Sequence, residues 1–258
     1  MGYDNGKWKT PYVTAKTAVF DDSFADCKLY STSAWFKGCP NLKEIKGLSN
    51  LNTDNVTNMS SMFSGCSSLT SLDLSCFKTD NVTDMSSMFD GCSSLMSLDL
   101  SGFKTDDVTY MKYMFSGCSS LTSLDVSSFK TNNVKDIKYM FYGCSNLTTI
   151  YAGDGWNVKR VTSDNNMFAY CTKLVGGQGT KYNSSYTDNT YARIDGGTEA
   201  PGYLTYKVSS GIKDITVGGT IDGNVPVYDI GGSLLPALQK GINIIRFSNG
   251  QIKKVFIK

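Results

Sequence analysis

A repeat of about 26 residues constrains this chain more than any other feature of its sequence. Six cysteines recur at separations of 27, 26, 26, 26 and 27 residues, namely Cys39, Cys66, Cys92, Cys118, Cys144 and Cys171. The residues around them recur in step. The copy from Met62 reads MFSGCSSLTSLDLSCFKTDNVTDMSS, and similar copies start at Met88 and Met114. A fixed period of this length indicates an architecture in which each unit packs on the next.

Each copy divides into two parts with different apolar spacing. The first part, with Leu69, Leu72 and Leu74, follows the pattern LxxLxL and predicts a short strand whose side chains alternate between interior and exterior. The second part spaces its apolar residues at three to four from Val82 to Phe89, which predicts one or two turns of helix ending at Gly91. A single unit cannot bury its apolar side. Stacked units bury about seven large side chains each, at about 1.5 to 3 kcal/mol apiece.

Stacking of these units predicts an α/β solenoid. We expect a leucine-rich-repeat right-handed superhelix, with short parallel strands in one sheet and short helices along another side. Changes in regularity predict four parts: an N-terminal lead at 1–18, the repeat domain with its N-terminal cap at 19–177, a Gly/Ser/Thr-rich closing loop or linker at 178–207, and a small all-β module at 208–258. In the last part, two β-rich runs flank Ser248 to Gln251, which predicts a hairpin.

Composition removes several classes of function. The net charge is only +2, so the chain has no long-range attraction for nucleic acid or anionic lipid. The sequence has no histidine, which excludes Ser-His-Asp and Cys-His catalysis and histidine-based zinc chemistry. Acidic residues recur as columns and not as one unique pair, which disfavours a carboxylate-based hydrolase. We therefore expect no enzyme, no catalytic residue and no cofactor.

The sequence as given shows neither an apolar membrane span nor a typical signal peptide at its start. No apolar stretch approaches the length of about 18 residues that a membrane span requires. The start, Met1 to Gly6, is polar where a signal peptide would be basic and then apolar. We expect that a native signal peptide has been removed and that Met1 and Gly2 are not native.

The outward positions of the predicted strands form columns of like side chains. Asp73, Asp99 and Asp125 make an acidic stripe that ends at Tyr151. Hydroxyl side chains flank it, at Ser71, Ser97, Ser123 and Thr149. Because many repeat proteins bind partners on the strand face, these eight residues are the predicted binding site. The alternative is a solvated polar face. Unit charges about 4.8 Å apart in water repel by only about 1 kcal/mol, so the stripe requires no metal.

Two further columns have structural interpretations. Lys78, Lys104 and Lys130 recur as surface charges that would balance the aspartates. The cysteine column supplies one sulfur per copy in a row, without the tetrahedral convergence that zinc requires, so we expect buried thiols and no metal site. Cys27 and Cys76 lie outside this column. The sequence leaves open whether Cys27 forms a disulfide with Cys39.

Three other patterns bear on function. Recurrent Met-Phe pairs predict core packing and not a cofactor pocket: Met62-Phe63, Met88-Phe89, Met114-Phe115, Met140-Phe141 and Met167-Phe168. The segment from Gly176 to Thr180 is glycine-rich but lacks the Gly-Lys-Ser/Thr ending of a phosphate loop. Aromatic residues expected to be exposed favour glycan recognition as a second hypothesis: Tyr110, Tyr113, Tyr139 and Tyr151.

The motif MFxGCSSLTSLDLSxFKTDNVTDM resembles the BspA-like leucine-rich repeats of bacterial surface proteins. The segment after the repeats, from Tyr191 to Tyr203, is similar to one that follows such arrays in Bacteroidetes proteins. The run from Val227 to Gly232 and the closing Lys253 to Lys258 resemble a C-terminal sorting domain of that phylum. Ser233 stands where such domains have Arg or Gln, so a plain structural role of this module stays open.

The resemblance implies a secreted or cell-surface protein, with adhesion to host matrix proteins or to other bacteria as its role, and it supplies no catalytic residues. We therefore expect a non-enzymatic protein that binds a host or bacterial protein through its repeat surface. Glycan binding is the alternative. We expect no nucleic-acid partner and no membrane span in this chain.

Overall fold

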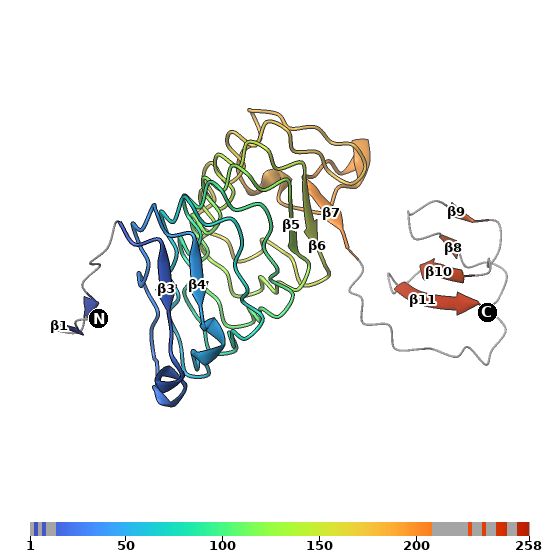
Figure 1. The fold of residues 1–258 in the computed structure, drawn as a ribbon. Helices are drawn as coiled ribbons and strands as arrows, with labels where there is room; N and C mark the ends of the chain where they lie inside the picture. The colour runs from blue at the N-terminus through green and yellow to red at the C-terminus, as the bar shows by residue number, and fades with distance from the viewer. Residues whose placement is uncertain are drawn as a thin grey trace. The chain divides into compact units, whose positions relative to one another are not determined.

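The computed structural model describes residues 14–207 throughout, together with strands at 3–4, 7–8, 227–228, 234–235, 241–246 and 252–257. The chain divides into two compact units, Met1–Val208 and Ser209–Lys258, and each is described by itself. In the first unit, successive copies of the repeat form similar coils of chain (Figure 1).

The first unit is built from short strands and 3-10 helices, and its described residues contain no α-helix. Its strands are β1 (Tyr3–Asp4), β2 (Lys7–Trp8), β3 (Thr17–Val19), β4 (Glu44–Lys46), β5 (Ser123–Val126), β6 (Thr149–Ala152) and β7 (Leu204–Tyr206). Its 3-10 helices are η1 (Asp22–Asp26), η2 (Leu48–Asn50), η3 (Asn189–Tyr191) and η4 (Gly197–Glu199). The pair β1-β2 is antiparallel, whereas β3-β4 and β5-β6-β7 are parallel.

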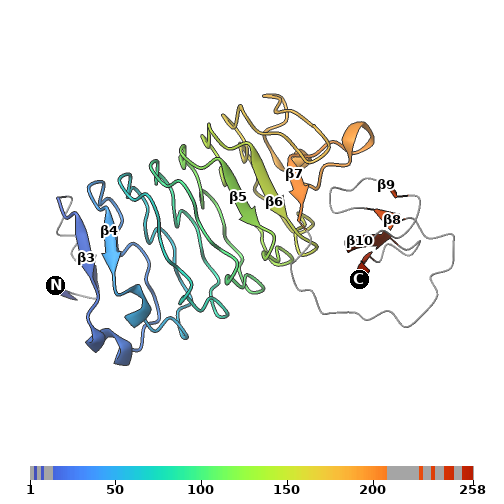
Figure 2. The ribbon, with the colours of Figure 1, turned by 45° about the vertical axis from the view of Figure 1, so that its right-hand side comes forward.

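Consecutive copies lie in register through parallel backbone pairing. The residues eight positions before each cysteine pair in succession: Ser31 with Asn58, Asn58 with Asp84, Asp84 with Tyr110, Tyr110 with Asp136, and Asp136 with Ser163. The corresponding coils of chain run side by side (Figure 2). Equivalent residues of adjacent copies are therefore neighbours in space.

The prediction of a helix from Val82 to Phe89 is wrong, because this segment forms a series of turns. Ser87 at φ 56° and Gly91 at φ 72° adopt the left-handed conformation, which cannot continue a right-handed helix. Alternate N–H groups instead donate to the next copy at 2.6–3.0 Å, as those of Met85, Ser87, Phe89 and Gly91 do to the carbonyls of Tyr110, Lys112, Met114 and Ser116. A helix would satisfy these groups within its own segment, whereas the turns use them to join copies.

The predicted continuous parallel sheet is interrupted. Strands β5 and β6 occupy the LxL pattern of two copies, and β7 extends the sheet beyond them. The equivalent residues 72–74 and 98–100 form no strand. Leu74 and Leu100 are nevertheless as buried as Leu124. The leucines thus define the interior whether or not their backbone pairs.

The interior consists of parallel columns of side chains. The phenylalanine column stacks ring on ring from Phe36 to Phe168, with consecutive centroids 5.6–5.8 Å apart and planes within 14°. The methionines of the repeated Met-Phe pairs are fully buried beside it. The prediction that these columns form the core is confirmed.

Distinct structures close the two ends of the stack. At the first end, the buried ring of Phe20 lies 5.0 Å from that of Phe24 and 5.9 Å from those of Trp35 and Phe36. At the other end, β7 pairs with β6 and the fully buried Tyr203 packs edge-on against Phe168. Residues 178–207 therefore fold onto the last copy as a closing segment.

The second unit contains an antiparallel sheet. Its described strands are β8 (Val227–Tyr228), β9 (Leu234–Leu235), β10 (Gly241–Arg246) and β11 (Ile252–Ile257), in the order β11-β10-β8-β9. Strands β10 and β11 pair along their whole length, as the predicted hairpin requires. Ser248 to Gln251, which carry the hairpin signal, lie outside the described residues.

Candidate functional site

The predicted acidic stripe lies on the exterior of the strands, but its carboxylates bind their own backbone. Oδ1 of Asp73, Asp99 and Asp125 accepts the backbone N–H two residues later at 2.9–3.0 Å. Hydrogen bonds from Ser75 and Ser101 lower the pKa values of Asp73 and Asp99. The flanking Ser71, Ser97 and Ser123 are exposed, and Thr149 is half-buried. Each aspartate therefore stabilises the turn after its strand position, which supports the alternative of a structural polar face.

The closing segment covers one end of the stripe. Lys207 forms an ion pair with Asp125, and its ammonium lies 5.7 Å from the ring centroid of Tyr151. Burial raises the pKa of Asp125, but hydrogen bonds from Lys207 and Ser127 outweigh it and lower the pKa overall. Asp125 and Tyr151 pair in register across β5 and β6. Two of the eight predicted site residues, Asp125 and Tyr151, thus already contact the side chain of Lys207.

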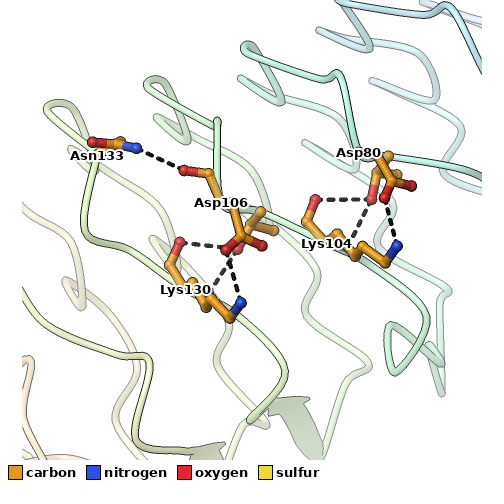
Figure 3. Close-up of polar contacts among 7 residues, drawn as sticks. Asp80, Lys104, Asp106, Lys130 and Asn133 are labelled. Carbon is orange, nitrogen blue, oxygen red and sulfur yellow. Dashed lines mark hydrogen bonds and ion pairs between the residues drawn. The ribbon is translucent and has the colours of Figure 1, made fainter.

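The lysine column does not balance the stripe as predicted. Lys104 pairs with Asp80 at 2.5 Å and Lys130 with Asp106 at 2.7 Å, in each case an aspartate of the preceding copy (Figure 3). Both pairs are largely exposed, and such pairs contribute little to stability. The backbone of Lys104 also binds the preceding copy. Its N–H donates to the buried hydroxyl of Thr79 at 2.8 Å, and that hydroxyl donates to the Lys104 carbonyl at 2.9 Å. This corner of the repeat joins copies, and the charges of Lys104 and Lys130 are paired with aspartates other than those of the stripe.

The cysteine column is buried, as predicted. From Cys66 onward, each thiol of the column donates to a phenylalanine carbonyl of the preceding copy at 3.0–3.2 Å. Burial raises the pKa of Cys92 and of Cys144 to about 12. All eight cysteines are free, so the bridge between Cys27 and Cys39 is not formed. The described residues contain no group of three His, Cys, Asp or Glu side chains placed to hold a metal.

The glycine-rich segment from Gly176 to Thr180 surrounds a carboxylate of the chain itself. Oδ2 of Asp195 accepts the N–H groups of Gln178 at 2.7 Å and Thr180 at 3.0 Å. Oδ1 accepts the hydroxyl of Thr180 at 2.6 Å and the N–H of Gly197 at 3.0 Å. Asp195 is only 5% exposed. The N–H groups that could bind an anion therefore hold the closing segment together.

The turns that precede the repeated cysteines form one side of the copies, the turn surface. A cluster of tyrosines interrupts its polar side chains. This tyrosine patch consists of Tyr113, Tyr139, Tyr142 and Tyr170. Tyr113 and Tyr139 stack at 4.7 Å with planes 7° apart. Tyr142 meets Tyr139 edge-on at 5.5 Å, and Tyr170 meets Tyr142 edge-on at 5.1 Å. Tyr170 is 61% exposed, and Tyr110, also on the turn surface, is 45% exposed.

The tyrosine patch departs from the repeat at every position. Five residues before the cysteine, the other copies have Ala34, Ser61, Ser87 and Asn166 where this surface has Tyr113 and Tyr139. Tyr142 stands where its neighbouring copies have Ser116 and Ala169, and Tyr170 replaces the repeated glycine. Tyr113, Tyr139 and Tyr170 have φ values of 57°, 57° and 64°. Ser61, Ser87 and Asn166 share this φ, so the conformation at Tyr113 and Tyr139 belongs to the repeat, and it is the change to aromatic side chains that marks the patch as a functional candidate.

The sequence pointed to only part of this patch. Tyr113 and Tyr139 were expected to be exposed but are half-buried, whereas Tyr142 and Tyr170 were not singled out as site residues. The change from MSSMF in the copies of Cys66 and Cys92 to MKYMF and IKYMF in the next two was the available signal. Tyr151, grouped with these tyrosines in the sequence, belongs to the strand side and lies under Lys207.

Short parallel strands, few helices and copies paired in register define a repeat protein. The sequence matches the family described as "Mycoplasma protein of unknown function, DUF285" over residues 12–98 and 73–182. These overlapping matches cover 171 of the 258 residues, and the chain belongs to this family. No curated protein and no solved structure matches the chain significantly. Within the described residues, no helix is long and apolar enough to cross a membrane.

Proposed function

We propose that this chain is a non-enzymatic binding protein, secreted or held at the cell surface, which adheres to a host or bacterial protein through its repeats. The observation that carries the proposal is the tyrosine patch. Tyr170 is exposed and the other three rings are half-buried, and adjacent copies fold with Ser, Ala or Gly at the same places, so the repeat itself does not require these rings. Tyrosine is enriched at protein interfaces because its rigid ring supplies apolar area and a hydroxyl at low entropic cost.

The contact surface in this proposal differs from the predicted strand face. The stripe from Asp73 to Tyr151 is engaged with backbone N–H groups and, at one end, with Lys207. The backbone N–H groups of Tyr113 and Tyr139 join copies, as that of Ser87 does, whereas their side chains make the ring contacts of the patch, and the Tyr139 hydroxyl accepts a hydrogen bond from the Asn166 side chain at 3.3 Å. The tyrosine patch is therefore the first surface to test, and the stripe is the second.

The proposal extends to the class of repeat and to the second unit. The register of successive copies supports a right-handed leucine-rich-repeat solenoid of BspA-like type, in which turns replace the expected helices. The antiparallel sheet of β8 to β11 is compatible with a sorting domain like those of secreted Bacteroidetes proteins. Loss of export from a native host after deletion of 209–258 would test that role.

The binding proposal is tested by comparing two matched double variants. Tyr139→Ser with Tyr142→Ser restores residues found at these places in other copies, so folding should persist. We expect binding to immobilised host matrix proteins or to partner bacteria to fall by about tenfold or more, as for central aromatic contacts. Asp73→Ala with Asp99→Ala should leave binding unchanged. Full binding by the tyrosine variant would contradict the proposal, and loss in the aspartate variant alone would return the site to the strand face.

Glycan binding is the second candidate function. Tyr113 favours it, because Tyr139 stacks on one face of its ring and the preceding copy has Ser87, not an aromatic residue, at the equivalent place. Tyr151 no longer supports this function, since Lys207 already occupies a place over its ring.

A further inference from the structure

The aromatic stack of the turn surface ends at Tyr113. Tyr113 and Tyr139 lie at equivalent places of adjacent copies and stack at 4.7 Å, nearly parallel. The residue at the same place of the preceding copy is Ser87, and the one before that is Ser61. A serine side chain is too short to cover a ring. On the side of Tyr113 away from Tyr139, the preceding copy therefore supplies a hydroxyl and not a ring at the equivalent place.

The half-buried carboxylate of Asp90 belongs to the same turn as Ser87. Tyr139 and Tyr142 of one copy are in ring contact at 5.5 Å, so the places five and two residues before a cysteine adjoin. In the copy of Cys92 these two places hold Ser87 and Asp90. Burial raises the pKa of Asp90, although a hydrogen bond from Ser116 and the charge of Lys37 oppose the rise. The charge of Asp90 is also felt by the phenol of Tyr113.

We propose that a pyranose ring of a glycan binds over Ser87, stacked on the open face of Tyr113, with its hydroxyl groups donating to Asp90. The sugar takes the place of a third ring in the Tyr113–Tyr139 stack. This inference rests on glycan binding, the second candidate function, and names the chemical group that the tyrosine patch contacts. It assigns the subsite to the junction of the copies of Cys92 and Cys118.

The chemistry of the junction favours a sugar over an aromatic side chain of a protein partner. A pyranose has an apolar C–H face that suits a tyrosine ring, and its edge carries hydroxyl donors. A carboxylate has about four acceptor positions, so Asp90 retains capacity beyond its bond with Ser116. A phenylalanine placed on Tyr113 would desolvate this carboxylate without giving it a donor, which is costly. The mixed surface of ring, hydroxyl and carboxylate therefore matches a polyhydroxylated ligand.

The repeat supplies variants that alter this subsite with little risk to the fold. Ser87→Tyr places the chain's own ring over Tyr113, at a backbone position that accepts tyrosine in the next two copies. Tyr113→Ser removes the stacking face, and Asp90→Ser restores the residue of the copies on either side. Ser61→Tyr makes the same chemical change as Ser87→Tyr, one copy further from Tyr113.

The test uses the full chain on an array of neutral oligosaccharides. Proton saturation-transfer NMR follows, with the methyl glycosides of glucose, galactose, mannose and N-acetylglucosamine. We expect binding by the wild type and a loss of affinity of about tenfold or more in Ser87→Tyr, Tyr113→Ser and Asp90→Ser, consistent with loss of one aromatic contact. Ser61→Tyr should not weaken binding. Near-ultraviolet circular dichroism and thermal unfolding check that each variant folds.

Two outcomes would overturn the inference. One is a wild-type chain that binds no sugar on the array or in solution, and the other is undiminished sugar binding by a folded Ser87→Tyr variant. If the wild type binds no sugar but captures a protein partner, and Tyr139→Ser with Tyr142→Ser weakens that capture, the binding function stands while the sugar subsite fails. If neither sugar nor protein binding depends on the tyrosine patch, both proposals fail.

Discussion

The strand side and the turn surface of the same copies use repetition in different ways. On the strand side, Asp73, Asp99 and Asp125 recur, and each accepts a hydrogen bond from the backbone two residues later. On the turn surface, the repeated serine gives way to Tyr113 and Tyr139 although the backbone conformation stays the same. A side chain that recurs with the same contact in every copy is explained by the fold. One that departs from its column without a structural need is the better functional candidate.

The largest expected effect is on the interior that both surfaces share. Phe89→Ala and Phe115→Ala should each lower the free energy of unfolding by about 3 to 5 kcal/mol, because each removes a fully buried ring from the same stack. Chemical denaturation measures both. Similar losses would support one continuous interior beneath unlike surfaces. A much smaller loss at Phe115 would mean that the copies with tyrosines pack differently.

The next effect concerns the segment that closes the stack. Asp195→Ala should cost about 1 to 3 kcal/mol, because it removes a buried carboxylate that accepts the partly buried N–H groups of Gln178 and Thr180. Hydrogen bonds from Thr180 and from backbone N–H groups outweigh burial and lower the pKa of Asp195. The stabilisation is therefore complete above the ordinary carboxyl pKa of about 4 and is lost as pH falls through the lower folded-state value.

Unfolding measured between pH 7 and pH 2 checks this sign. The wild type should lose more stability on acidification than Asp195→Ala does. Parallel curves for the two proteins would show that this carboxylate does not couple folding to pH.

A smaller effect, of opposite sign, is expected on the turn surface. Tyr170→Gly should raise stability by about 0.5 to 1 kcal/mol, because glycine relieves the left-handed conformation at φ 64° and the lost ring is mostly exposed. The melting temperature reports the change. Gly143→Ala is the matched control, since it introduces the same strain in the adjacent copy and should destabilise. A destabilised Tyr170→Gly would show that Tyr170 supports the fold, and the functional reading of the tyrosine patch would weaken.

The smallest effect is expected on the strand side. Asp99→Ala should cost about 0.5 kcal/mol, because it removes one exposed side-chain acceptor from the N–H of Ser101. Equilibrium unfolding and partner binding should be measured together. A change in binding larger than the change in stability would give the acidic stripe the functional role that the turn surface holds in our proposal.

The sequence by itself determined the repeat, its register and its interior. Period and apolar spacing were enough to place Phe63, Phe89, Phe115 and their equivalents in one buried column, because identical units can bury their apolar side only against each other. The cysteines followed by the same argument. The hairpin of β10 and β11 was also predictable, since its signal is local.

The tertiary structure decided which groups accept the backbone hydrogen bonds of the segments between the leucines. It also decided which contacts the exposed columns of side chains make. The spacing from Val82 to Phe89 suits both a helix and a row of turns, and the hydrogen bonds from Met85 and Phe89 to the next copy select the turns. Likewise, no local pattern shows that Asp125 meets Lys207, 82 residues away, or that Tyr139 meets Tyr142 and Tyr113 in one cluster. These outcomes depend on contacts between distant parts of the chain, which local periodicity does not encode.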